Sequence, residues 1–350
     1  MEQVRVWSPS QVVEVFTGWG AEEAAATAGG ALIVVSLDEP GPGDEAARLL
    51  RALPLVSVCL SSRGSGTSAA GGFDVALTGA QSPPAPWVGV RDPEVELGRL
   101  AAAVTARPNT SVALAQLLRM GESLEVADAL VAESVTYAML QGGREHRAWL
   151  SSHTPAAAGP QEEPAVLVER DGDRLLVTLN RPHVHNAFNI EIRDALAEAL
   201  RLLAADDTIA AMHLRGRGRT FCSGGDLTEF GSVADPVTGH LVRSTRGVGA
   251  LMHQVADRVS VHLHGRCYGA GIEVPSFARR VIAAPGTRLV LPELRMGLIP
   301  GAGGTAGISR RIGRQRTAWL ALTGHALDAA TALEWGLVDE IEGITPPSQR

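Results

Sequence analysis

The chain has 350 residues, enough for two domains with buried cores, and 45% of them are hydrophobic, which excludes wholesale disorder. Its formal net charge of −7 argues against a nucleic-acid-binding surface. No apolar run approaches the roughly 18 residues that a membrane-spanning helix needs.

Cysteine and lysine usage narrows the chemistry further. The odd number and wide spacing of Cys59, Cys222 and Cys267 predict neither a disulfide framework nor a metal-binding Cys-x-x-Cys pair. All 31 basic residues are arginines, which excludes Schiff-base catalysis by lysine. The first residues lack a basic region followed by an apolar one, so we expect no secretion signal and a cytoplasmic protein.

Residues 1–150 are predicted to form a first unit. Its early part holds three apolar runs with the length of buried strands, at 31–37, 55–60 and 73–77, and a helix over 44–53. Strand, helix, strand predicts a parallel βαβ arrangement. The glycine-rich 61–67 segment could hold phosphate, but only serine and threonine surround its glycines, and a flexible surface connection is the favoured interpretation.

Helices then replace strands. Apolar residues near helical spacing, with glycines as stops, predict three helices, 94–106, 111–120 and 124–140, and 145–149 ends the unit. Residues 151–164 are rich in proline and alanine and are predicted to be an exposed linker.

The second half has its own sequence of elements. The predicted ones are a hairpin over 165–180, an amphipathic helix over 190–204, a buried strand over 210–214, a mobile loop over 229–243 and a helix that ends near 255.

The stretch after this helix predicts a strand, a glycine turn and a helix. Val261 and Leu263 alternate as in a strand, Gly269 and Gly271 permit a tight turn, and 272–278 predicts a helix. Such a turn leaves backbone N–H groups unpaired at the helix start, where they can bind developing negative charge.

Two acids accompany this turn. Glu273 follows it directly, and Glu293 comes 20 residues later. Two carboxylates beside oxyanion-type donors suit the addition or removal of water next to a carbonyl. On spacing alone, an ordinary glycine turn with two solvated surface glutamates is the favoured interpretation.

Several motifs, in a fixed order along the chain, favour a catalytic role for this turn and its two glutamates. They run through the second half in this order: 179–182 (LNRP), 186–189 (NAFN), 221–227 (FCSGGDL), 269–273 (GAGIE), 292–293 (PE), 297–304 (GLIPGAGG), 322–324 (LTG) and 336–338 (GLV). Together they resemble the crotonase (enoyl-CoA hydratase/isomerase) superfamily. The resemblance implies an α/β fold with a crotonase-like ββα spiral core over 165–342, followed by a tail over 343–350.

The same resemblance implies site residues. The backbone N–H groups of Gly225 and Ala270 would form an oxyanion hole for an acyl-CoA thioester. Glu273 would mainly orient and activate water, and Glu293 would mainly transfer a proton at Cα. The two roles are not strictly separate, because coupled carboxylates titrate as a pair. Further substrate contacts are implied along the CoA path and beside the thioester, at His183, Val184, His185, Ala187, Gly224, Asp226 and Tyr268.

The implied activity is hydration of an enoyl-CoA or dehydration of a 3-hydroxyacyl-CoA, with no cofactor besides the CoA of the substrate. Alternatives are an isomerase, a decarboxylase, a hydrolase, a cofactor-independent oxygenase or a non-catalytic subunit. The implied partners are an acyl-CoA substrate and further copies of the chain, as a trimer or hexamer, with no nucleic acid and no membrane. Two His-x-His pairs, 183/185 and 262/264, lack a third ligand, so we expect no metal.

The first half bears a fainter resemblance. Its strands resemble the crotonase core without the paired glutamates, so we interpret it as a degenerate crotonase-like half, with a generic α/β accessory domain as the alternative. Crotonases ordinarily continue with several helices after the position of Ile341, where this sequence has only a few residues more. We expect the helices over 94–150 to take their place.

Overall fold

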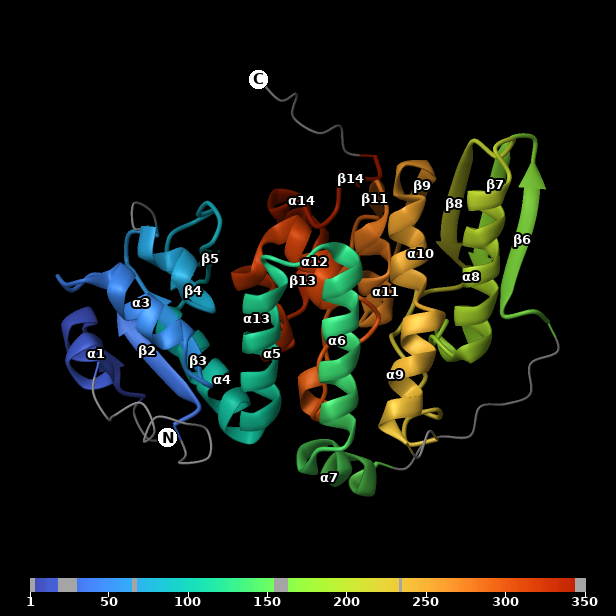
Figure 1. Ribbon diagram of the computed structural model, residues 1–350. Helices are drawn as coiled ribbons and strands as arrows, with labels where there is room; N and C mark the ends of the chain where they lie inside the picture. The colour runs from blue at the N-terminus through green and yellow to red at the C-terminus, as the bar shows by residue number, and fades with distance from the viewer. Residues whose placement is uncertain (1–3, 18–29, 65–67, 154–162, 233–234, 344–350) are drawn as a thin grey trace. The chain divides into compact units, whose positions relative to one another are not determined.

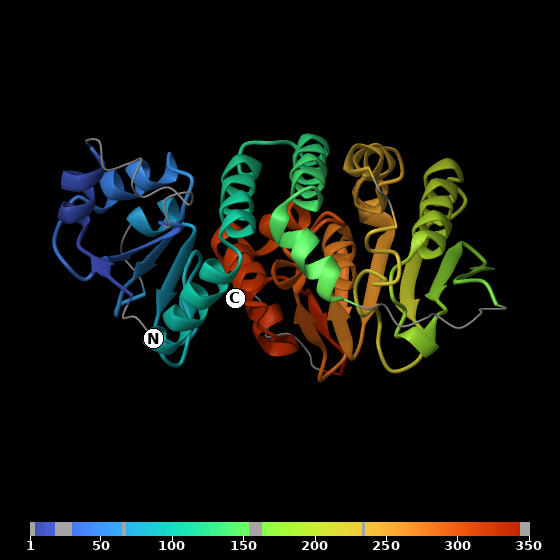
Figure 2. The ribbon, with the colours of Figure 1, turned by 90° about the horizontal axis from the view of Figure 1, so that it is seen from below.

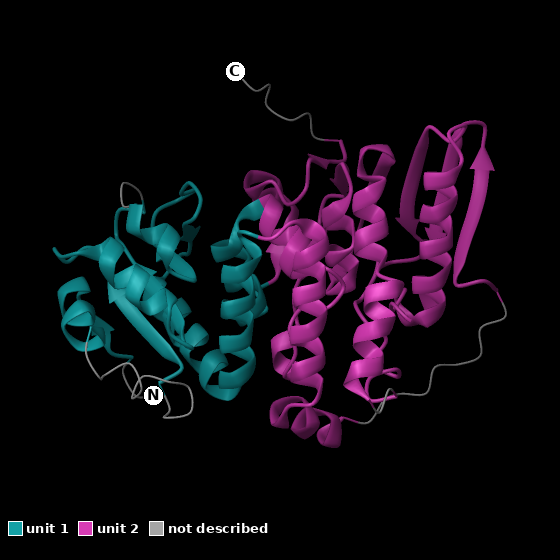
Figure 3. Cartoon of the chain, in the orientation of Figure 1, with its two compact units in different colours: residues 1–123, 312–325 teal, residues 124–311, 326–350 magenta. Residues whose placement is uncertain are grey.

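The computed structural model describes residues 4–17, 30–64, 68–153, 163–232 and 235–343, so most of the predicted linker and tail lies outside the described residues. The chain divides into two compact units (Figure 3). The first contains 1–123 and 312–325, and the second contains 124–311 and 326–350. The division therefore falls before the predicted helix over 124–140, whereas we had expected it at 151–164.

A parallel sheet forms the centre of the first unit, with its described strands in the order β1-β2-β3-β4-β5. The elements of this unit are β1 (Val6–Trp7), α1 (Pro9–Phe16), β2 (Leu32–Ser36), α3 (Gly43–Arg51), β3 (Val56–Leu60), the 3₁₀ helix η2 (Ser68–Gly72), β4 (Val75–Thr78), β5 (Val88–Gly89), α4 (Pro93–Ala106), α5 (Pro108–Gly121) and α13 (Arg314–Thr323). The three predicted strands and their helix are confirmed. The resemblance of this unit to a degenerate half stays a prediction.

Both faces of this sheet are buried. Ile33 and Val35 point into a core shared with α1 and α3, where Leu50 and Phe73 are fully enclosed. Because side chains alternate along a strand, their neighbours face the other way, where α5 and α13 contact β3 and β4. Burial on two faces explains why these strands read as unbroken apolar runs.

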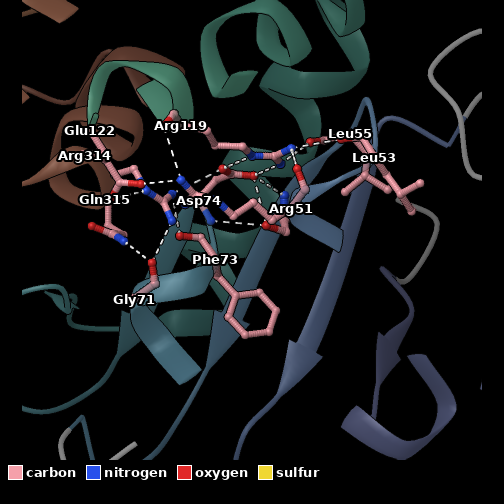
Figure 4. Close-up of polar contacts among 11 residues, drawn as sticks. Arg51, Leu53, Leu55, Gly71, Phe73, Asp74, Arg119, Glu122, Arg314 and Gln315 are labelled. Atoms are coloured by element: carbon pink, nitrogen blue, oxygen red, sulfur yellow. Dashed lines mark hydrogen bonds and ion pairs between the residues drawn. The ribbon is translucent and has the colours of Figure 1, made fainter. Parts of the chain in front are cut away.

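Asp74, just before β4, joins α5 and α13 to the sheet through charged hydrogen bonds (Figure 4). Arg119 of α5 donates to it through Nε at 2.8 Å and through Nη2 at 2.5 Å. Arg314 of α13 donates to it at 3.4 Å and to the Phe73 carbonyl at 2.8 Å. Ser57 donates twice more, so the carboxylate is buried with every oxygen engaged.

The second unit is built on two sheets. The larger has the order β14-β11-β9-β8-β7-β6, parallel except for the β6–β7 hairpin, and the smaller has the order β10-β12-β13. Its elements are α6 (Val126–Gln141), α7 (Arg144–Ser152), β6 (Val166–Asp171), β7 (Arg174–Leu179), η3 (Pro182–Val184), α8 (Ile190–Ala205), β8 (Ala211–Gly216), α9 (Pro236–Thr245), α10 (Val248–Gln254), η4 (Ala256–Arg258), β9 (Val259–Leu263), β10 (Arg266–Tyr268), α11 (Ala270–Glu273), η5 (Pro275–Phe277), β11 (Arg280–Ala283), β12 (Arg288–Val290), η6 (Glu293–Met296), α12 (Gly304–Ile312), β13 (Leu327–Asp328), α14 (Ala329–Trp335) and β14 (Glu340–Ile341).

Helices cover one face of the larger sheet. Figure 2 shows α8 and α10 above its strands, and Figure 1 shows α6 alongside α9. The predicted hairpin, the helix over 190–204 and the strands around it are confirmed. The mixed α/β class is confirmed as well.

The predicted loop over 229–243 is wrong in its second part, because α9 begins at Pro236. Asp235 caps this helix, since its carboxylate accepts hydrogen bonds from the N–H groups of Val237 and Thr238. Proline at the first helical position needs no hydrogen-bond acceptor, so Asp-Pro is a helix start. In the described part of the chain, no helix is long and apolar enough to cross a membrane.

Candidate active site

The turn at Gly269 brings two glutamates to one point. Its backbone (φ +49°, ψ −120°) lies where residues with side chains are strained, and α11 begins at the next residue. A Cβ on Gly269 would lie 2.5 Å from Glu293 Oε1 and 3.7 Å from Glu273 Oε1. Both carboxyl groups therefore face the space beside the Gly269 Cα, one from α11 and the other from η6.

A second glycine turn lies against the first. The Tyr268 N–H donates to the Cys222 carbonyl at 3.0 Å, and Cys222 pairs with Cys267 as in a parallel sheet. Two residues further on, Gly224 adopts φ +95°, and a Cβ on it would lie 3.9 Å from the Gly269 Cα. The two segments that the sequence singled out are thus neighbours in space.

The next residue of each turn is a predicted oxyanion donor, Gly225 in one and Ala270 in the other. Within the described residues, neither N–H donates a hydrogen bond to the protein. Ala270 is the first residue of α11, where helical N–H groups have no acceptor in the helix. Two backbone donors without acceptors, in adjacent turns, can hold an oxygen that becomes negatively charged.

The two glutamates are buried in different surroundings. Glu273 Oε2 accepts hydrogen bonds from the N–H groups of Ala302 and Gly304, at 2.8 and 3.0 Å. Glu293 Oε2 is buried and accepts no hydrogen bond from the described residues. A buried carboxylate oxygen without a donor is costly, so Glu293 is suited either to carry a proton or to meet a substrate group.

Burial raises the pKa of both acids, because the charged form loses its hydration. The pKa of Glu293 rises to about 8. The pKa of Glu273 rises well above its ordinary value, with the charges of Glu293 and Glu133 adding to the burial and the two backbone N–H groups opposing it.

Glu133, on α6, is a third carboxylate at this place. It is 2% exposed, and its oxygens accept from the N–H of Gly303 at 2.7 Å and from the N–H and hydroxyl of Thr305 at 2.9 and 2.6 Å. Burial raises its pKa to about 7. Sequence analysis missed it. Its only signal was a glutamate four residues after Ala129 on the buried side of the helix.

Tyr137, one turn further along α6, is a second residue that the sequence did not indicate. A Cβ on Gly301 would lie 2.4 Å from two carbons of its ring, so the tyrosine packs directly on the loop before α12. The guanidinium of Arg243, from α9, lies 4.6 Å from the ring centroid on its face. Burial raises the pKa of Tyr137 and lowers that of Arg243.

The predicted CoA-binding residues follow β7 and lie against the second glycine turn. His183 and Val184 belong to η3, and His185 follows with φ +57°. The imidazoles of both histidines are exposed, whereas the His185 carbonyl accepts from the Ser223 N–H at 3.0 Å. After Ala187, the next N–H donates to the Gly224 carbonyl at 2.8 Å. Backbone groups therefore connect this turn to the site.

Asp226 holds its own turn together. Its carboxylate accepts from Arg181 at 2.8 Å and from the hydroxyl and N–H of Thr228 at 2.7 and 3.1 Å. Burial opposes its ionisation, but these hydrogen bonds outweigh burial and lower the pKa of Asp226. These hydrogen bonds give the carboxylate a structural role in the turn, and its contact with substrate stays a prediction.

The histidine pairs show no metal arrangement. His262 lies 3.6 Å from a carboxylate oxygen of Glu342 and faces the ring of His213, whereas His264 hydrogen-bonds to the Gly218 carbonyl. Three or more potential metal ligands do not gather anywhere among the residues that the structure describes.

Comparisons with known proteins identify the family of the chain. A sequence model of the enoyl-CoA hydratase/isomerase family matches residues 171–344. The chain is 34% identical to trans-2-decenoyl-[acyl-carrier-protein] isomerase of Streptococcus mutans, over 50% of this chain and 68% of that protein. It is 32% identical to probable enoyl-CoA hydratase echA8 of Mycobacterium tuberculosis, over the same shares. It is 36% identical to 1,2-epoxyphenylacetyl-CoA isomerase of Escherichia coli, over 48% of this chain and 65% of that protein. The chain belongs to the enoyl-CoA hydratase/isomerase, or crotonase, family.

Proposed function

We propose that this protein is an enoyl-CoA hydratase, which adds water across the double bond of an α,β-unsaturated acyl-CoA or catalyses the reverse dehydration. The observation that carries the proposal is the convergence of Glu273 and Glu293 beside Gly269. Addition of water needs one group to take a proton from water and another to give one to Cα, so two carboxyl groups at one point suit it.

The reaction would proceed at the two glycine turns. The thioester oxygen accepts hydrogen bonds from the N–H groups of Gly225 and Ala270, which stabilise the enolate that forms when water adds at Cβ. The hydroxyl of water joins Cβ and its proton goes to one glutamate, while the other glutamate gives a proton to Cα. Atoms and charge balance without a cofactor other than the CoA of the substrate.

Hydrogen bonding supports a division of labour between the acids. Glu273 Oε2 accepts two backbone N–H groups, which favour its charged form, so we assign it to water activation. Burial raises the pKa of both acids, but Glu293 Oε2 accepts no hydrogen bond from the described residues that would favour its charged form, so we assign Glu293 to proton donation at Cα.

The substrate assignment rests on the turn after β7. CoA would run past His183 and His185 and contact mainly backbone, because both imidazoles are exposed. Assembly of several copies is a further expectation from the family.

The test is hydration of crotonyl-CoA, followed by loss of its enone absorbance. We expect Glu273→Gln and Glu293→Gln each to lower kcat by about 100-fold or more, because each removes a proton-transfer group. Glu198→Gln, an exposed change on α8, is the matched control and should keep wild-type activity. Full activity in both site variants would contradict the proposal, and a wild type that binds CoA but converts no acyl-CoA would favour a binding subunit.

An isomerase is the second candidate, favoured by one feature of the site. Glu293 Oε2 accepts no hydrogen bond within the described residues, and a single free carboxylate can move a proton from Cα to Cγ. Two of the relatives named above are isomerases. A 3-enoyl-CoA would distinguish the two activities, because isomerisation increases enone absorbance. If the protein is an isomerase, the isomerisation of a 3-enoyl-CoA should depend strongly on Glu293 and much less on Glu273.

A further inference from the structure

Four consecutive backbone N–H groups, at 302–305, are shared between two carboxylates in alternation. Those of residues 302 and 304 donate to Glu273, from α11. Those of residues 303 and 305 donate to Glu133, from α6. Neither carboxylate could hold this segment alone, because each engages only every second N–H group.

The segment needs acceptors from outside because it opens a helix. The first N–H groups of an α-helix have no carbonyl partner in the helix, and these belong to the start of α12 at Gly304. Buried N–H groups must find acceptors, and the positive end of the helix dipole favours carboxylates. The start of α12 therefore rests on two acids that come from other helices, Glu273 of α11 and Glu133 of α6.

The hydrogen bonds from this segment are the direct polar contacts of Glu133. Its oxygens accept from Gly303 and Thr305, whereas the charge of Arg243 lowers its pKa without a direct ion pair among the described residues. Burying a carboxylate is costly unless hydrogen bonds or a cation satisfy it. The three hydrogen bonds from this segment supply that satisfaction.

We propose that Glu133 is a positioning residue of the active site, which holds 302–305 in the place where Glu273 rests on it. The inference builds on the proposed function, since Glu273 is the assigned water-activating group. It adds a residue that lies outside 171–344, the part of the chain that the family model matches. If 302–305 shifts, Glu273 loses the support of its Oε2, and its Oε1 moves relative to Gly269 and Glu293.

Glu133 also adds a negative charge to the site. Its carboxylate faces Glu273 and Glu293, together with Tyr137 on its own helix and Arg243 from α9. Like charges raise the pKa of neighbouring acids, so removal of this charge should lower the pKa values of both catalytic glutamates.

Three variants separate these effects. Glu133→Ala removes both the acceptor and the charge, Glu133→Gln keeps one carbonyl acceptor but no charge, and Glu133→Asp keeps the charge on a shorter side chain. Asp128→Asn, an exposed change on the same helix, is the control for loss of one negative charge. Each is compared with wild type by peptide-level hydrogen–deuterium exchange and by acyl-CoA kinetics over a range of pH.

We expect Glu133→Ala to speed exchange in peptides that cover 302–305 by about 10-fold or more, and to lower kcat by about 10- to 100-fold with little change in KM. Glu133→Gln should protect 302–305 from exchange better than Glu133→Ala does, and the loss of its kcat on the acid side of the pH profile should occur at lower pH than in wild type. Glu133→Asp should recover part of kcat, with the acid-side loss of activity at the same pH as in wild type. Asp128→Asn should match wild type.

The proposal is overturned if Glu133→Ala folds with exchange and kcat like those of Asp128→Asn. If Glu133→Ala fails to fold, Glu133→Gln provides the test. The role is refuted if this variant has the same pH profile of kcat and the same exchange in 302–305 as wild type. If wild type converts no acyl-CoA, the proposed function fails, yet the exchange comparison still tests whether Glu133 holds 302–305.

Discussion

Arg314 Nη1 lies 3.4 Å from Asp74 Oδ1, although 240 positions separate the two residues in the sequence. Arg314 starts α13, and the whole of 314–322 is buried. A helix within the family-matched part of the chain is therefore a structural component of the first unit. The first unit is consequently not an appendage with a fold of its own.

Replacing Asp74 should weaken the first unit strongly. Asp74→Ala leaves Arg119 buried without its carboxylate and leaves Arg314 with Glu122 alone, and breaking a buried ion pair typically costs about 3–5 kcal/mol of unfolding free energy. Urea denaturation should show a much lower midpoint. Asp44→Asn is the control, because Asp44 is exposed and its hydrogen bonds to described residues go to Ser68 alone, and its effect should stay within about 0.5 kcal/mol. Equal midpoints for both variants would show that the network does not stabilise the fold.

Deleting residues 1–150 should give insoluble or inactive protein. The deletion removes the sheet that buries α13 and also removes α6 with Glu133 and Tyr137. Solubility, circular dichroism and crotonyl-CoA hydration of a 160–350 fragment measure the outcome. A stable and fully active fragment would contradict both the need of α13 for the sheet of the first unit and the role of α6.

Gly269→Ala should abolish activity through a steric clash with a catalytic acid. Its Cβ would lie 2.5 Å from Glu293 Oε1, so the carboxyl group must move, and we expect kcat to fall by about 100-fold or more. Gly286→Ala is the matched control, because Gly286 also has positive φ (+85°) but no atom lies within 4 Å of its Cβ. Both variants should lose stability of the order of 1–2 kcal/mol from backbone strain. Similar activity of the two would refute the clash.

The unfolding free energy of the protein should fall as pH rises from about 5 to 8.5. Glu133 and Glu293 have folded-state pKa values of about 7 and 8 against an ordinary 4.5, so the folded protein binds protons that the unfolded chain has released. Stability from these groups is complete below pH 4.5 and is lost as pH passes 7 to 8. The Glu133→Gln/Glu293→Gln double variant should show a flatter dependence in urea denaturation, and Glu198→Gln should not. A wild-type stability that rises over this range would contradict the burial of charge that we describe.

Much of the fold could be predicted because its strands carry their own signals. β2, β3 and β4 are apolar runs, and the hairpin of β6 and β7 turns at Gly172 with φ +60°. β1 and β5 have two residues each, too few for a pattern. In α9, Val237 and Leu241 are 63% and 57% exposed, so no buried stripe marked the helix.

Long-range pairing explains what the sequence could not indicate. α13 begins Arg-Gln-Arg, a sequence that is typical of a solvated surface. It is buried because Arg314 donates hydrogen bonds to the carbonyls of Gly71 and Phe73, which lie far away in the sequence. Glu273 and Glu293 were found because they lie in recognisable motifs. Glu133 was not, since the N–H groups it binds come 170 residues later and nothing local distinguishes it.

The placement of 312–325 in the first unit has a consequence for biosynthesis. A ribosome makes the described strands of that unit early, but α13, which contacts β4, is made only after the whole of 124–311. We therefore expect the apolar surface that α13 covers to stay exposed on the nascent chain until then.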